Sequence, residues 1–156
     1  GHTGAETCKI AYMKMASLSR TFRIQKRDFT NAGNASISVK KLLKSLNLSA
    51  CVIRKVSICG YEGEMNVVMH ATTDGVLELE LTERNIRLTV SDKGPGIEDI
   101  ETAMQKGYST ASDEFREMGF GAGMGLYNIR ENADFLHIDS TPGTGTVIRM
   151  EFRTRG

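Results

Sequence analysis

Two glycine-rich blocks in the second half of the chain restrict its fold more than any other feature. The first, residues 91–97, reads Ser-Asp-Lys-Gly-Pro-Gly-Ile and follows an alternating, strand-like run that ends at Asp92. The second, residues 119–127, reads Gly-Phe-Gly-Ala-Gly-Met-Gly-Leu-Tyr and leads into a helical pattern. A glycine turn after a strand and a glycine ladder before a helix both let the backbone approach a charged ligand closely. Together the blocks predict a nucleotide pocket with one fixed carboxylate, that of Asp92.

The spacing of apolar residues predicts an α+β fold. Alternating apolar and polar residues indicate strands, and a period of about 3.6 residues indicates helices. We expect strands over residues 21–29, 76–81, 86–92, 135–140 and 146–152, and helices over 38–47, 49–70 and 124–132. Ser49 is a candidate N-cap of the second helix, and Gly60 and Gly63 are weak points within it. Asp74-Gly75 is typical of a hairpin turn, and residues 98–118 suggest a mobile segment in which Ile100 and Met104 are candidates to begin a short helix. This order predicts a two-layer sandwich, with helices on one face of a mostly antiparallel sheet.

The length and composition indicate one domain. A chain of 156 residues can bury a substantial core but is short for two ordinary domains. We expect a single domain over residues 20–156 and an N-terminal extension over residues 1–19, whose first residues, Gly1 and His2, are compatible with a remnant of cloning.

The chain lacks the sequence features of a membrane or secreted protein. No stretch approaches the roughly 20 apolar residues that cross a bilayer, and the opening residues lack the apolar centre of a signal peptide. Three cysteines without a Cys-x-x-Cys pair indicate reduced thiols in the core of a cytoplasmic protein: Cys8, Cys51 and Cys59.

Charge is distributed unevenly along the chain. Residues 1–58 hold 11 Lys or Arg against 2 Asp or Glu, and residues 59–156 hold 9 against 17, so the formal charges are +9 and −8. Such a basic front attracts nucleic acid or an acidic protein, or simply forms solvated faces. We favour solvated faces, with an acidic protein second, because aromatic residues that stack on bases are sparse there. The basic residues include Arg23, Lys26, Arg27, Lys40, Lys41 and Lys44.

Asp92 is the candidate base-recognition residue. A carboxylate held at a strand end accepts a hydrogen bond from an exocyclic amine such as that of adenine, worth about 1.5–3 kcal/mol. Gly94 and Gly96 remove side chains that would block a flat ring. The alternative is an ordinary turn, since these are turn residues in any case.

The glycine ladder over residues 119–125 is a candidate phosphate site. Backbone N–H groups at a helix N-terminus bind anions, and glycines allow close approach. The spacing matches neither the dinucleotide-binding fingerprint nor the P-loop. A flexible linker is the alternative, but Phe120, Met124 and Leu126 argue against it, because linkers rarely contain large apolar residues.

Glu62 and Asn66 are candidates for a general base and a magnesium ligand. They are four residues apart in the second expected helix and therefore share a face. Mg²⁺ takes few protein ligands, so one Asn suffices when phosphates and water supply the rest. The alternative is a polar helix face. His70, one turn further on, is interpreted as a helix-end histidine, and with His2 and His137 it predicts no metal cluster.

Four motifs in this order resemble the GHKL ATPase superfamily, which includes gyrase, Hsp90-type chaperones and histidine kinases. Glu62 to Asn66 is similar to the N box, residues 92–96 to the first glycine box, residues 121–126 to the second, and residues 142–146 to the closing strand motif. The resemblance covers roughly residues 20–153. Within the superfamily, the small size and the segment from 100 to 125 resemble the bacterial anti-sigma factor serine kinases.

This resemblance implies a fold, an activity and a set of roles. The protein would bind ATP and Mg²⁺ and phosphorylate a serine on a STAS-domain antagonist, with a sigma factor as a further partner and a homodimer as an expected assembly. Asn66 would hold Mg²⁺, Glu62 would be the catalytic base, Thr146 would assist Asp92 at adenine, and residues 98–122 would form an ATP lid. The nucleotide site would comprise Asn66, Asp92, Gly94, Gly96, Ile97, Gly121, Gly123, Met124, Gly125, Leu126 and Thr146.

A second interpretation is a nucleotide-binding module that sequesters a partner without efficient phosphoryl transfer. Met65 stands where the kinases often carry Arg or Thr, and Gly63 is unusual in this helix. A detached histidine-kinase domain is a third, but no dimerisation helix with a phosphoacceptor histidine precedes residue 20.

Overall fold

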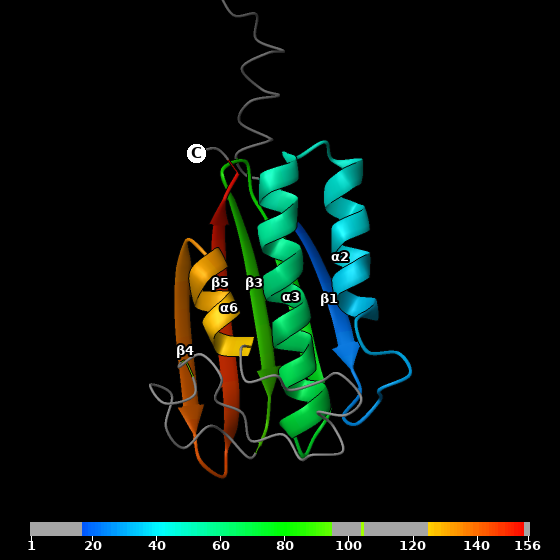
Figure 1. Cartoon of the computed structure of the whole chain (residues 1–156), viewed down its shortest axis with the longest axis vertical. Coiled ribbons are helices and arrows are strands. Elements are labelled where there is room, and N and C mark those ends of the chain that lie inside the picture. Colours follow the sequence, from blue (N-terminus) through cyan, green and yellow to red (C-terminus); the bar gives the residue numbers. More distant parts are fainter. Residues whose placement is uncertain (1–16, 95–103, 105–124, 155–156) are drawn as a thin grey trace, which may run out of the picture.

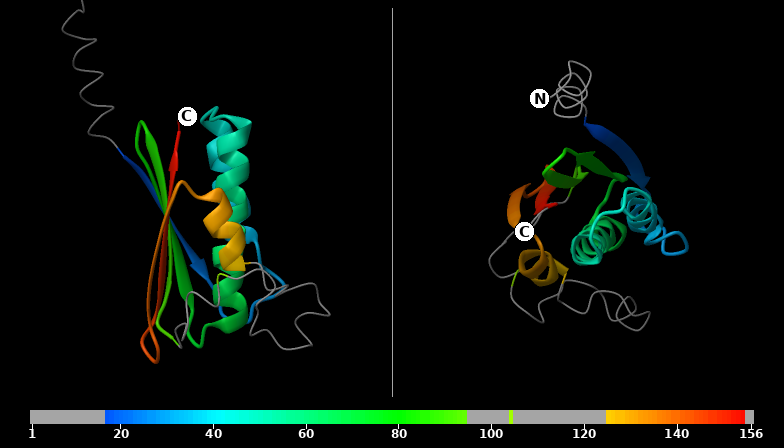
Figure 2. Two further views of the ribbon diagram at one scale, coloured as in Figure 1. Left: turned by 60° about the vertical axis from the view of Figure 1, so that its left-hand side comes forward. Right: turned by 90° about the horizontal axis from the view of Figure 1, so that it is seen from above.

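A computed structural model describes residues 17–94, 104 and 125–154, which form a five-stranded sheet with helices on one face (Figure 1). Figure 2 shows the two layers from the side and from above. The elements are β1 (Leu18–Ile24), α2 (Asn34–Ser45), α3 (Ala50–His70), β2 (Gly75–Leu81), β3 (Asn85–Asp92), α6 (Gly125–Asn132), β4 (Phe135–Thr141) and β5 (Gly145–Arg153). The strand order is β1-β2-β3-β5-β4, with every pair antiparallel. The predicted α+β sandwich is therefore confirmed.

The core lies between the sheet and the helices, and strand alternation determines which residues enter it. In β3, Ile86, Leu88 and Val90 are buried while the residues between them are partly exposed. The same alternation places Ile148 and Met150 of β5 in the core, directly opposite residues of β3. A period of two in one half-buried sheet is what made these strands predictable.

Two predicted boundaries near the sheet edge are wrong. The first strand covers Leu18–Ile24 rather than 21–29, because the chain leaves the sheet where Ile24 pairs with Gly75, the first residue of β2. Asp74-Gly75 does not form a hairpin turn but joins α3 to β2. A Cβ on Gly75 would lie 2.7 Å from the Ser91 carbonyl oxygen, so glycine is needed here for close packing.

The start of α2 was also predicted too late, because its cap comes from another helix. Glu64 of α3 is 3% exposed and accepts hydrogen bonds from the backbone N–H groups of Gly33 at 3.0 Å and Ser36 at 2.9 Å. The Ser36 hydroxyl donates a third at 2.7 Å. A carboxylate that satisfies free N–H groups at a helix start stabilises that end, so α2 begins at Asn34 rather than Ser38.

Helix α3 runs without a break through the two glycines that the sequence marks as weak points. Ser49 caps it as predicted, since its side chain accepts from the Val52 N–H at 3.2 Å. A Cβ on Gly63 would lie 2.9 Å from Cγ2 of Val90, so this glycine lets α3 pack closely on β3. At 21 residues the helix is about 32 Å long and spans the layer from one end to the other.

The cysteines divide between core and surface. Cys59 is fully buried, and its thiol lies 3.7 Å from the Ile129 carbonyl oxygen as a donor. Burial raises the pKa of Cys59 to about 12, with the charge of Glu62 adding to the effect, so this thiol stays protonated. Cys51 is exposed at the start of α3, so the prediction of a core position was wrong for it, and Cys8 lies outside the described residues.

None of the helices in the described part of the chain is long and apolar enough to cross a bilayer.

Candidate functional site

The predicted site residues that the structure describes gather at one end of the sandwich. The ends of β3 and α3 and the start of β5 lie at the lower end of Figure 1, and α6 starts in the lower half, near α3. The backbone joins them, because the Thr72 N–H, just beyond α3, donates to the Gly94 carbonyl at 2.9 Å. The Lys93 N–H donates to the Thr73 hydroxyl at 3.1 Å. The turn after β3 is therefore fixed to the C-terminal end of α3.

Glu62 lies where α3 meets the start of α6. The Asn128 side-chain amide donates to its Oε1 at 3.1 Å, and a Cβ on Gly125 would lie 3.3 Å from its Oε2. Burial raises the pKa of Glu62 above its ordinary value, and the hydrogen bond from Asn128 partly opposes that shift. A carboxylate whose pKa is moved toward neutrality is a better proton acceptor than a fully solvated one. Its Oε2 is the oxygen that Asn128 does not occupy.

Asn66 lies one turn beyond Glu62 on α3 and is partly exposed. Its side chain makes no hydrogen bond to any other residue of the described ranges, so its amide oxygen is available to a ligand. No group of three or more His, Cys, Asp or Glu in those ranges is arranged to hold a metal ion. A single amide oxygen suits Mg²⁺ only when phosphate and water complete the coordination.

Asp92 ends β3 in a turn that it helps to close. Its Oδ1 accepts from the Gly94 N–H at 2.9 Å. Burial raises the pKa of Asp92, and the hydrogen bond from Gly94 partly opposes this effect. Its second oxygen, Oδ2, has no hydrogen-bond partner among the described residues. Asp92 therefore combines a fixed position with one acceptor that remains for a ligand.

Thr146 lies directly opposite Asp92 in the pairing of β3 with β5 and is 3% exposed. Its hydroxyl lies 2.9 Å from that of Ser140, its partner across β4 and β5. Three polar side chains on adjacent strands thus form a row: Asp92, Thr146 and Ser140. Ser140 was not predicted as a site residue, because its position beside Thr146 depends on how β4 pairs with β5.

Gly145 makes this row possible. Its φ is +142°, and a Cβ there would lie 2.2 Å from the Asp92 carbonyl oxygen and 2.7 Å from Cα of Lys93. No side chain fits this space, so glycine allows β5 to begin directly beside the end of β3.

The glycine ladder is described only at its end. Gly125 begins α6, and Leu126 is 8% exposed, with its side chain in the core. Met104 packs against the core. The predicted site residues Gly96, Ile97, Gly121, Gly123 and Met124 lie outside the described residues, as do the expected lid over 98–122 (apart from Met104) and the mobile segment.

Asn128 is the second candidate site residue that the sequence did not reveal. It lies in a helix whose pattern predicts only an amphipathic segment, and its contact with Glu62 joins positions 66 residues apart. His70, in contrast, ends α3 as expected; burial lowers its pKa, and the nearby positive charge of Arg27 lowers it further.

Comparison with known proteins gives one matching family and a set of similar proteins. The family described as "Histidine kinase-, DNA gyrase B-, and HSP90-like ATPase" matches residues 61–156, which contain every residue of the site above. The chain is 29% identical over 145 residues to the anti-sigma F factor of Thermoanaerobacter sp. (strain X514), covering 89% of this chain and 93% of that protein. It is 30% identical over 129 residues to the anti-sigma F factor of Clostridium beijerinckii, covering 78% and 87%. A shorter match, 37% identical over 93 residues, covers 57% of this chain and 62% of the anti-sigma F factor of Caldanaerobacter subterraneus.

Proposed function

Because the chain belongs to the histidine kinase-, DNA gyrase B- and HSP90-like ATPase family, we propose that it is an ATP-dependent protein serine kinase of the anti-sigma type. In this proposal it phosphorylates a serine of a STAS-domain antagonist in a bacterial partner-switching pathway and also binds a sigma factor. Its similarity to anti-sigma F factors over most of their length supports this choice within the family. The proposal places the protein in the cytoplasm.

The observation that carries the proposal is the position of Glu62. It is a partly buried carboxylate, one turn from Asn66, with Oε1 held by Asn128 and Oε2 beside the start of α6. We assign Oε2 as the atom that takes the proton of the attacking serine hydroxyl. Such a base needs a fixed direction, and the hydrogen bond from Asn128 supplies it.

The remaining roles follow from the geometry of each side chain. Asp92 would accept the adenine amino group at Oδ2, while Oδ1 keeps its bond to Gly94. Thr146, paired with Asp92 and bonded to Ser140, would assist at the base. Asn66 would offer its amide oxygen to Mg²⁺, and the backbone at Gly125 would face phosphate at the start of α6.

When bound, Mg-ATP supplies the transferable phosphoryl group and a cation that offsets phosphate charge. Everything else depends on positioning by this chain, since phosphoryl transfer requires alignment and charge neutralisation more than covalent help from the protein. The two features that made a non-catalytic module attractive have packing explanations. Met65 is 2% exposed in the core, and Gly63 allows close contact between α3 and β3.

The test is phosphorylation of purified STAS-domain proteins from the source genome by the full chain with radiolabelled Mg-ATP. We expect serine labelling by the wild type, and loss of labelling in Glu62→Ala with ATP affinity retained. Glu83→Ala, an exposed change between β2 and β3, is the matched control. Full labelling by Glu62→Ala would contradict its role as the base. ATP binding without labelling of any STAS protein would favour a nucleotide-binding module that sequesters its partner.

A further inference from the structure

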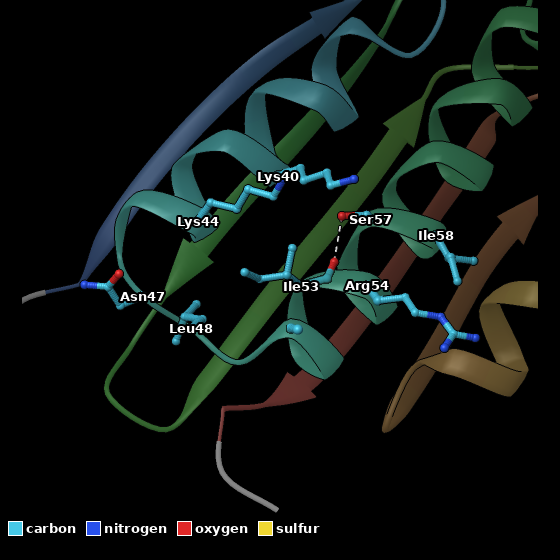
Figure 3. Close-up of a pocket in the computed structure, with 9 residues that line it drawn as sticks. Lys40, Lys44, Asn47, Leu48, Ile53, Arg54, Ser57 and Ile58 are labelled. Carbon is cyan, nitrogen blue, oxygen red and sulfur yellow. Dashed lines mark hydrogen bonds between the residues drawn. The ribbon is translucent and has the colours of Figure 1, made fainter.

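A groove between α2 and α3 has no role in the proposed reaction. It has a volume of about 650 Å³ and lies where the C-terminal half of α2 meets the N-terminal half of α3 (Figure 3). Its lining includes three cationic and three aliphatic side chains: Lys40, Lys44, Arg54, Leu48, Ile53 and Ile58. We call this surface the α2–α3 groove.

The charge of the α2–α3 groove has a single sign. Residues 34–61, from the start of α2 to the middle of α3, contain five Lys or Arg and no Asp or Glu. Among the ion pairs within the described ranges, none involves Lys40, Lys44 or Arg54. Like charges placed together repel one another, so this cluster is balanced best by an anionic partner.

The cations that line the α2–α3 groove come from both helices, with aliphatic side chains between them. In Figure 3, Lys40 and Lys44 extend from α2, whereas Arg54 extends from the side of α3 that faces away from α2, toward α6. Ile53 lies between the two lysines and Arg54, and Leu48 lies on the segment that joins α2 to α3. The Ser57 hydroxyl is already occupied by its bond to the Ile53 carbonyl at 2.6 Å. A ligand for this surface therefore needs carboxylates along its flanks and an apolar stripe between them.

The helix pattern extends the apolar surface beyond the groove. Ile37 lies three residues before Lys40 on α2, and Tyr61 lies three residues after Ile58 on α3. They are 49% and 41% exposed, and a Cβ on Gly33 would lie 3.6 Å from the Tyr61 ring, so both belong to the same end of the helix pair. An exposed stripe of this kind along two helices suits a short amphipathic helix laid into the groove.

We infer that the α2–α3 groove docks an acidic amphipathic helix of a partner protein, with aliphatic side chains on Ile53 and Leu48 and carboxylates on Lys40, Lys44 and Arg54. A nucleic acid fits this surface less well, because the groove lining offers aliphatic rather than aromatic contacts for bases. The docking surface is separate from the nucleotide site, since Asn66 lies 12 residues beyond Arg54 on α3, about 18 Å along its axis.

The test is fluorescence anisotropy of the full chain with a labelled helical peptide whose one face carries Leu and whose flanks carry Glu. A peptide with Gln in place of Glu, one with Ser in place of Leu, and a single-stranded oligonucleotide of equal charge are the comparison probes. Lys40→Glu/Lys44→Glu/Arg54→Glu is the groove variant. Arg84→Glu/Arg149→Glu/Arg153→Glu changes net charge equally at exposed positions elsewhere and is the matched control.

We expect saturable binding that weakens by about ten-fold or more in the groove variant, with little change in the control variant. The Gln and Ser peptides should both bind more weakly, and added salt should weaken the binding of the acidic peptide. Circular dichroism of both variants verifies that they remain folded. Equal loss in the two variants, no saturable binding by the wild type, or tighter groove-dependent binding of the oligonucleotide would each overturn the proposal.

Discussion

Replacing Glu64 by Gln should destabilise the protein strongly, although the two side chains have nearly the same size and shape. Each carboxylate oxygen of Glu64 accepts two hydrogen bonds at the start of α2. Oε2 receives the N–H groups of Gly33 and Ala35, at 3.0 and 3.3 Å, and Oε1 receives the N–H and hydroxyl of Ser36. Glutamine keeps one of these oxygens and places an NH₂ group against the donors of the other.

The magnitude follows from the bonds that are lost. At least one backbone N–H would face an NH₂ group at a site where Glu64 is 3% exposed, so water cannot replace the acceptor. Bonds to a charged group contribute about 1.5–3 kcal/mol, and the loss of a helix cap costs about 1 kcal/mol. Since these terms overlap, we expect a loss of about 2–4 kcal/mol, a large part of the roughly 5–15 kcal/mol that stabilises a typical domain.

Equilibrium unfolding in urea, followed by circular dichroism, measures this difference. The midpoint should fall while the slope stays unchanged, because the variant alters stability and not the surface exposed on unfolding. Glu83→Gln, in the exposed β2–β3 loop, should change stability by less than about 0.5 kcal/mol. A loss below about 1 kcal/mol for Glu64→Gln would refute the idea that this carboxylate fixes the start of α2.

Three further predictions concern the site itself. Glu62→Gln should be more stable than the wild type at neutral pH, because burial raises the pKa of Glu62 and ionising this carboxyl in the folded protein costs stability. The difference in urea midpoint should grow as the pH rises through the raised pKa and vanish below the ordinary value of 4.5, and a difference that does not change with pH would argue against this explanation. Asn128→Ala removes a bond that lowers the pKa of Glu62, so the acidic limb of the pH profile of phosphoryl transfer should move to higher pH with ATP affinity unchanged. The control is Asn132→Ala, whose side chain bonds the backbone carbonyl of Asn128, and an unmoved limb in Asn128→Ala would exclude this positioning role. Gly145→Ala should lower the free energy of unfolding by about 2 kcal/mol or more and weaken ATP binding, because the added Cβ would lie 2.2 Å from the Asp92 carbonyl oxygen. If the variant melted like the wild type, the close approach of β3 and β5 would be contradicted.

The parts of the fold that the sequence predicts are those governed by local chemistry. The alternating residues of β2, β3 and β5 are half-buried, and Ser49 bonds a backbone N–H three residues away. In each case the physical cause lies within a few residues of the effect. The order of elements and the α+β layers followed from these local patterns.

The errors share a different cause, which is contact between distant segments. The start of α2 depends on Glu64, about 30 residues downstream, and the role of Gly75 depends on β3 and α3 beside it. Asn128 is placed at the site by the contact of α6 with α3, and Ser140 by the pairing of β4 with β5, and neither contact can be inferred from local sequence. Glu62, Asn66, Asp92 and Thr146 were predicted as candidates, but their hydrogen bonds and burial were not accessible to sequence reasoning.

Calorimetric titration of the full chain with Mg-ATP, beside Asp92→Asn, tests the central assignment most directly. Asparagine keeps an acceptor for the Gly94 N–H, so the turn should persist while the charged acceptor at Oδ2 is lost. The proposal predicts that wild-type binding weakens by about 10- to 100-fold in Asp92→Asn and stays unchanged in Asp139→Asn, an exposed control on β4. Equal ATP affinity in Asp92→Asn and the wild type, or no binding by either, would contradict the nucleotide pocket on which the proposed kinase activity depends.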